Sequence, residues 1–274
     1  MLKNIFIILF IFLVSLVFIR EDRIDMNTNK YDLNKHGVCV IKNIFTPEEI
    51  EHIKDLMIRE DYKTLKDLLI HHKDFLYSLK KKTTSDYIFQ DYIFIIKKSS
   101  IHICHRDSNG DFFNKTQKYP SYTLILYIED MNNKCLGVIP KSHVSRYKNA
   151  INIGDKIINL ACNKGDIILF NANLIHVGTL HEKSDHMRIQ MKMVHPDDKE
   201  TIHYYEKYNK ILNADNNLPT HLRKAHTNIS CMFPILSDIT QTSNVDLSRG
   251  KYNSKYFSYL FYGNKDFYDL QNAF

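Results

Sequence analysis

Histidines that stand two positions before an aspartate are the residues best suited to chemistry in this sequence. The 274-residue chain has 14 histidines and three such triplets, which are His72–Asp74, His105–Asp107 and His195–Asp197. Two imidazoles and one carboxylate can bind a metal on one face and leave positions for other ligands, as in non-haem Fe(II) oxygenases. About one such triplet is expected from composition alone, so the choice depends on the surrounding elements.

Those elements favour the second triplet. Residues 64–80 are predicted to be helical, and residues two apart on a helix project to different sides, so His72–Asp74 is expected on a solvated helix face rather than at a metal. His105–Asp107 ends a strand-like run and enters a turn, where both side chains can converge. His195–Asp197 also ends a predicted strand, but nothing after it resembles a barrel that could supply a second histidine.

The second histidine is expected at His176, which emerges from a buried apolar strand that begins after the turn at Gly165. If the next alternating run pairs with this strand as a hairpin, Arg188 points into the same interior as His176. A buried guanidinium there suits the distal carboxylate of 2-oxoglutarate. Lys192 on the same face could compete for that anion. Thr179 could add a hydroxyl to it, or could cap a turn.

The order of predicted elements indicates a mainly β fold with flanking helices. A strand at residues 36–41 precedes a helix that starts at Pro47 with Thr46 as its N-cap, and a second helix follows at 64–80. Helices first and many strands afterwards suggest an antiparallel sandwich or barrel with helices on its outside. The remaining predicted strands are 87–97, 122–129, 136–140, 166–170 and 187–194.

Residues 36–194 resemble the phytanoyl-CoA dioxygenase family of 2-oxoglutarate oxygenases. The matching segments are 37–41, 45–50, 136–143 and 165–170, the last of them followed by His176. Lys141 stands where the family has a glycine. Asp107 is present, which separates the chain from the halogenase branch, where a small residue replaces this ligand. The last 75 or so residues match no pattern of the family.

The resemblance implies a double-stranded β-helix, a jelly-roll or cupin-like fold, with Fe(II) bound by His105, Asp107 and His176. It also implies 2-oxoglutarate as co-substrate, anchored by Arg188, and O₂ as oxidant. Oxidative decarboxylation of 2-oxoglutarate to succinate and CO₂ would be coupled to hydroxylation of a lipid or small metabolite. Two alternatives stay open, a prolyl or lysyl hydroxylase and a β-helix binding module without turnover.

The amino terminus predicts a membrane anchor. The segment 1–20 is almost wholly apolar and approaches the roughly 17 to 25 residues that a spanning helix needs. A signal peptide is the rival interpretation, although bulky residues stand where a cleavage site would need small ones. The division expected is an anchor at 1–20, a linker at 21–34, the oxygenase domain at 35–200 and an extension of unknown role at 201–274. The side of the membrane is open, with basic residues after the anchor mildly favouring a cytoplasmic body.

Charge and cysteine content exclude some classes. The 37 basic and 31 acidic residues are interspersed, so no basic stripe indicates nucleic-acid binding. The five cysteines are widely spaced and odd in number, which suggests neither a disulfide framework nor a zinc ribbon, and most are expected to be small buried apolar residues.

Overall fold

The computed structural model describes the greater part of the chain between residues 23 and 235. The described ranges are 23–98, 103–107, 117–131, 135–144, 151–152, 157–178, 186–200, 208–213 and 218–235, together with Ile7, Ile11 and Ser15. Within these ranges no helix has the length and apolar character needed to cross a membrane. Apart from those three single residues, the predicted anchor at 1–20 lies outside the described residues.

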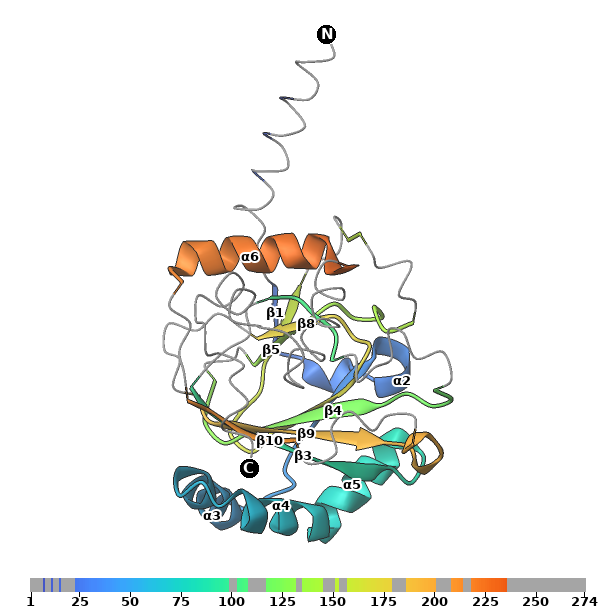
Figure 1. Ribbon diagram of the computed structural model, residues 1–274, viewed down its shortest axis with the longest axis vertical. Helices are drawn as coiled ribbons and strands as arrows, with labels where there is room; N and C mark the ends of the chain where they lie inside the picture. Colours follow the sequence, from blue (N-terminus) through green and yellow to red (C-terminus); the bar gives the residue numbers. More distant parts are fainter. Residues whose placement is uncertain are drawn as a thin grey trace.

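Two β-sheets form the body of the protein (Figure 1). The larger sheet has the order β10-β3-β9-β4-β7-β2, and the smaller has the order β1-β6-β5-β8. The larger sheet comprises β2 (Val38–Ile41), β3 (Ile88–Lys98), β4 (Tyr122–Tyr127), β7 (Ile167–Asn171), β9 (Arg188–Val194) and β10 (Tyr208–Asn213). The smaller comprises β1 (Arg23–Asp25), β5 (Leu136–Val138), β6 (Ile158–Leu160) and β8 (His176–Gly178). The pairs β1–β6 and β10–β3 are parallel, and the other described pairs are antiparallel.

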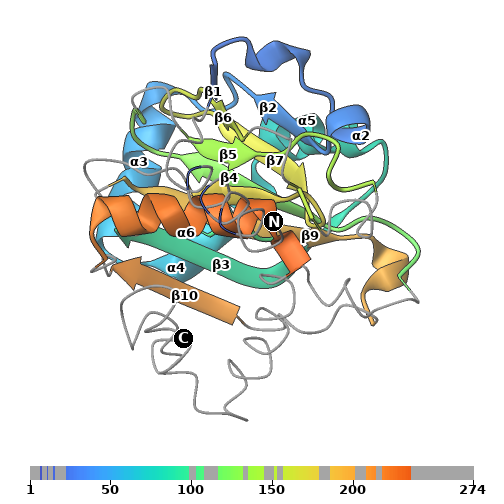
Figure 2. The same cartoon turned by 90° about the horizontal axis from the view of Figure 1, so that it is seen from above.

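Helices cover the outer faces of both sheets (Figures 1 and 2). Three helices, α3 (Pro47–Ile58), α4 (Tyr62–His71) and α5 (Lys73–Thr83), lie against the larger sheet. The helix α6 (Thr220–Met232) lies on the opposite side, beside the smaller sheet. Short elements fill the connections: η1 (Thr28–Lys30), α2 (Leu33–His36) and η2 (Pro196–Asp198).

Strand alternation divides the apolar residues among three layers. On β9, Ile189, Met191 and Met193 pack with the helices α3–α5, so the even-numbered residues of this strand face the space between the sheets. Residues such as Val138 and Phe170 from the two sheets fill that space. A third cluster lies between the smaller sheet and α6. Side chains that face inward from the larger sheet therefore meet those from the smaller one.

The mainly β architecture with outer helices confirms the predicted fold class and is consistent with a jelly roll. The predicted start of α3 is also confirmed. The Thr46 hydroxyl accepts a hydrogen bond from the Glu49 backbone N–H at 3.2 Å, and the Glu49 carboxylate accepts one from the Thr46 N–H at 2.8 Å. The apolar face of α3 is buried as its periodicity predicts, through Ile50, Ile53, Leu56 and Met57.

The second predicted helix is broken in two at His72. The His72 Nδ1 accepts a hydrogen bond from the Phe75 N–H at 3.2 Å and so begins α5, while its Nε2 lies 3.2 Å from the Glu49 carboxylate. The expectation of a solvated helix face for His72 was therefore wrong, because this imidazole is a cap held against α3. The segment expected as a linker, 21–34, contributes β1, which pairs with β6. Leu33 at its end is buried.

The predicted hairpin between the strands before and after His176 is wrong. The strand β7 pairs with β2 and β4, and β9 pairs with β3 and β4. His176 instead begins β8 in the smaller sheet, beside β5. The chain leaves the larger sheet after β7 and crosses to the smaller one, so His176 and Arg188 approach the interior from opposite sheets.

Two of the five cysteines form a disulfide, which the spacing of the cysteines did not predict. Cys104 is bonded to Cys231 on α6, and the Cys104 N–H also donates to the Ser230 hydroxyl at 2.8 Å. The other three cysteines are buried free thiols, as expected: Cys39, Cys135 and Cys162. The disulfide joins α6 to the strand segment that leads into the His105–Asp107 triplet.

Candidate metal centre

His105 and His176 lie directly opposite each other on neighbouring extended segments. The His105 N–H donates to the His176 carbonyl at 2.9 Å, and the His176 N–H donates back to the His105 carbonyl at 2.9 Å. Directly opposed residues of an antiparallel pair project from the same face. Their ring centroids are accordingly 4.3 Å apart. The adjacent residues Cys104 and Val177 face the other way, into the cluster beneath α6.

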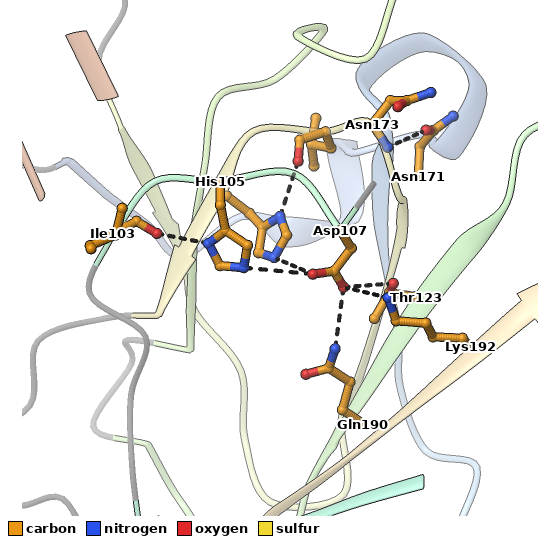
Figure 3. A network of polar contacts seen from close by, with 10 residues as sticks. Ile103, His105, Asp107, Thr123, Asn171, Asn173, Gln190 and Lys192 are labelled. Atoms are coloured by element: carbon orange, nitrogen blue, oxygen red, sulfur yellow. Dashed lines mark hydrogen bonds and ion pairs between the residues drawn. The ribbon is translucent and has the colours of Figure 1, made fainter. Parts of the chain in front are cut away.

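Asp107 completes the group from the same segment as His105. Residues two apart on an extended chain share a face, so its carboxylate turns toward both imidazoles (Figure 3). Asp107 Oδ1 lies 3.6 Å from His105 Nε2 and 3.5 Å from His176 Nε2. In the part of the chain that the structure describes, this is the one group of three metal-ligating side chains found, and its ligand atoms lie within 4.8 Å of one another. The three residues predicted as ligands are therefore brought together.

Backbone carbonyls set the orientation of both imidazoles. His105 Nδ1 lies 2.7 Å from the Ile103 carbonyl oxygen, and His176 Nδ1 lies 3.0 Å from the Leu174 carbonyl oxygen. A carbonyl can only accept a hydrogen bond, so each Nδ1 must carry the proton. In the neutral ring the lone pair then lies on Nε2, which faces Asp107. Carbonyl partners of this kind orient metal-binding histidines.

The electrostatics of the centre favour the forms that bind a metal. Burial is the main cause that lowers the pKa of His176, to about 4, with His105 adding to the effect and Asp107 opposing it. Burial alone would raise the pKa of Asp107, but the Lys192 ammonium and the imidazoles outweigh it, so this pKa lies well below its usual range. At neutral pH the group therefore offers an ionised carboxylate and a neutral His176. Lone pairs and negative charge converge on one point, an arrangement that a cation stabilises.

Three further polar side chains bind the other oxygen of Asp107, and two of them have no counterpart in the sequence interpretation. Oδ2 accepts hydrogen bonds from the Thr123 hydroxyl at 2.8 Å and the Gln190 amide at 3.2 Å, and Lys192 Nζ lies 3.9 Å away. For Lys192 the sequence predicts only competition for an anion. Thr123 and Gln190 could have been noticed as polar residues inside apolar strands, but nothing in the sequence says that they face Asp107.

Arg188 lies at the start of β9, opposite Tyr127 on β4. It shares the inward face with Gln190 and Lys192, the two residues of this strand that reach Asp107. Arg188 is partly buried, and loss of solvation lowers the pKa of its guanidinium. One of its nitrogens, Nη1, donates to the His186 carbonyl at 3.1 Å. Thr179, the other residue predicted to bind 2-oxoglutarate, lies outside the described residues.

Comparisons with known proteins find likeness in structure only. No family model matches the chain, and no curated protein matches it. Among solved structures, AviO1 from Streptomyces viridochromogenes is 12% identical, with a TM-score of 0.45 over 64% of this chain and 97% of that one. The non-heme alpha-ketoglutarate-dependent carbocyclase SnoK from nogalamycin biosynthesis is 10% identical, with a TM-score of 0.46 over 59% of this chain and 80% of that one. HygX from Streptomyces hygroscopicus, solved with nickel and 2-oxoglutarate bound, is 14% identical, with a TM-score of 0.42 over 59% of this chain and 83% of that one. Likenesses at this level carry no argument about the class or the reaction of this chain.

Proposed function

We propose that the chain is a non-haem iron enzyme that uses 2-oxoglutarate and O₂ to hydroxylate its substrate. The observation that carries this proposal is the convergence of two imidazole Nε2 atoms and Asp107 Oδ1, with each Nδ1 held by a carbonyl. Two imidazoles and one carboxylate on one side of a metal are the donor set of non-haem Fe(II) oxygenases. His105, Asp107 and His176 are the proposed ligands.

The residues around the ligands have separate proposed roles. Fe(II) with 2-oxoglutarate and O₂ would supply an oxidative decarboxylation that yields succinate and CO₂ and places one oxygen atom in a substrate C–H bond. Lys192 lies beside Asp107, which leaves Arg188 as the cation proposed for the distal carboxylate. Arg188 precedes Gln190 by two residues, roughly 7 Å along the strand, so it lies on the same inward face as a residue that contacts Asp107. The possible contribution of Thr179 stays a prediction.

We also propose that residues 35–200 form a double-stranded β-helix. The support is the pair of facing sheets and the origin of the ligands, which come from the smaller sheet and the segment paired with it, while Arg188 comes from the larger. The disulfide and the contacts of Cys231 give part of the extension 201–274 a role, because α6 packs against the segment that carries His105.

The proposed substrate is a lipid or small metabolite, as the family resemblance implies, with a prolyl or lysyl side chain as the alternative. A screen that measures succinate release with candidate lipids, metabolites and peptides separates these classes. Stimulation by a peptide alone would replace the first proposal with the second. Binding of Fe(II) and 2-oxoglutarate without succinate release in air, whatever the compound offered, is the outcome expected of a binding module.

A membrane anchor at 1–20 stays part of the proposal, on the strength of the apolar run alone. The disulfide supports a body in an oxidising compartment, because structural disulfides are rare in a reducing cytosol. This is the opposite side from the one that the basic residues mildly favoured. Asn114, in an Asn-Lys-Thr sequence, serves as a probe. In a eukaryotic host an endoglycosidase-sensitive band that Asn114→Gln removes is expected, and an unglycosylated membrane-bound protein with free Cys104 would place the body in the cytosol.

The direct test of turnover is iron-dependent release of succinate from 2-oxoglutarate in air. The full-length protein should form succinate only when Fe(II) is present, and His176→Ala should abolish this release. His52→Ala is the matched control, because His52 is an exposed histidine on α3. Equal release from wild type and His176→Ala would attribute the succinate to a contaminant and contradict the proposal.

A further inference from the structure

The two oxygens of Asp107 have different surroundings, and Figure 3 shows the division. Oδ1 faces the Nε2 atoms of His105 and His176. Oδ2 faces away from them, toward Thr123, Gln190 and Lys192 at 2.8, 3.2 and 3.9 Å. One oxygen is thus presented to the metal-binding atoms, and the other is surrounded by donors.

The donors are placed by the pairing of two strands in the larger sheet. Thr123 on β4 stands directly opposite Lys192 on β9, and Gln190 is the neighbouring inward residue on the same strand. Thr123 is fully buried, and Lys192 is only 2% exposed. The chain therefore places three polar side chains on the inner wall at the point where that wall meets Asp107.

Neutralising a buried carboxylate explains only part of this arrangement. A buried charge needs a partner of opposite charge, and Lys192 alone supplies one. Thr123 and Gln190 add no charge, and both donate hydrogen bonds to Oδ2, the oxygen with which Lys192 forms an ion pair. Donors that approach one oxygen from two strands fix the rotation of the carboxylate. They also occupy the lone pairs that would let Oδ2 coordinate a metal.

We propose that Thr123, Gln190 and Lys192 are positioning residues that bind Oδ2 of Asp107 and leave Oδ1 alone for the metal. The inference rests on the proposed function. Two imidazoles, one carboxylate oxygen and a bidentate 2-oxoglutarate leave one of six positions open for O₂. A carboxylate that bound through both oxygens would close that position. The three donors thus keep the metal open to O₂ without touching it.

The test compares Thr123→Val with Thr123→Ser in the full-length protein. Thr123→Val keeps the size of the side chain and removes the hydroxyl donor, whereas Thr123→Ser keeps the donor and removes one methyl group. Anaerobic competition with a chelator gives the dissociation constant for Fe(II). Mutation of a residue that hydrogen-bonds a metal ligand typically lowers metal affinity by about 10- to 100-fold. Thr123→Val should therefore weaken Fe(II) binding by at least about tenfold, and Thr123→Ser should bind Fe(II) within a few-fold of wild type.

A second variant and a second readout separate positioning from folding. Gln190→Met removes the amide donor from a different strand and should weaken Fe(II) binding in the same way. In Co(II)-loaded protein the intensity of visible absorption depends on coordination number. Thr123→Val and Gln190→Met should change it, while Thr123→Ser should not. A purely structural role predicts lower thermal stability with unchanged absorption and affinity.

The two levels of the proposal fail in different ways. Wild-type protein that binds no Fe(II) would overturn both the proposed function and this inference. Fe(II) binding by the wild type, with equal affinity in Thr123→Val and Thr123→Ser and no change in Gln190→Met, would overturn the positioning role alone.

Discussion

Cys231→Ala should lower the stability of the protein more than substitution of any of the three free cysteines. The disulfide closes a loop whose ends are 127 positions apart. A cross-link of that span limits the conformations of the unfolded chain. In the loop-entropy model this raises the free energy of unfolding by about 5 kcal/mol at 25 °C. Because Cys104 directly precedes His105, loss of the bond also frees the segment that carries two of the proposed ligands.

Urea unfolding with and without a thiol reductant measures the effect. Reductant should lower the wild-type midpoint to that of Cys231→Ala and should leave the variant unchanged. Cys39→Ala is the matched control, because Cys39 is buried and free, so it loses packing without losing a cross-link. A wild-type midpoint that does not respond to reductant, or a Cys39→Ala variant as unstable as Cys231→Ala, would refute this reasoning.

The remaining predictions concern the anion site, pH and a strained turn. At saturating Fe(II), Arg188→Met should raise the KM for 2-oxoglutarate by at least tenfold, about 1.4 kcal/mol, and Lys192→Met should not; a larger effect at Lys192 would exchange their roles. The pKa of His176 is about 4 in the folded protein against 6.5 for an ordinary histidine. The unfolded chain therefore binds the extra proton between those values, and the stability of the metal-free protein should fall as pH drops from 6.5 to 4, by up to about 3 kcal/mol. Urea midpoints across that range measure this, and His176→Gln should make the profile less steep. Lys141 has φ of 70°, a left-handed conformation that costs a non-glycine residue about 1 kcal/mol. Lys141→Gly should therefore raise the free energy of unfolding by about that amount, and an unchanged or lower urea midpoint would contradict it.

The grouping of His105, Asp107 and His176 was predictable because the signals for it are local. A strand that ends at His105 and a buried strand followed by His176 are visible in the order of residue types, and the structure brings both to one point. The partners of Asp107 were not predictable, because they depend on the register between β4 and β9. A shift of either strand by one residue would turn its polar residues toward the helices.

The errors in the predicted fold also arise where contacts between distant residues decide the structure. The apolar spacing of α4 and α5 continues across His72, so only the capping contact of that imidazole reveals the break. The strands β1, β6 and β8 have three residues each, too few to show alternation. The disulfide pairs residues from distant parts of the chain, and cysteine spacing does not determine connectivity.

The central claim is that the chain binds Fe(II) and 2-oxoglutarate together, and the visible absorption of the anaerobic protein tests it most directly. When both are added, the wild type should develop the charge-transfer band of a chelate between Fe(II) and the 2-oxo acid. His52→Ala should keep the band, and His176→Ala should lose it along with iron binding. Folded wild-type protein that shows no band, with iron binding unchanged in His176→Ala, would contradict the account.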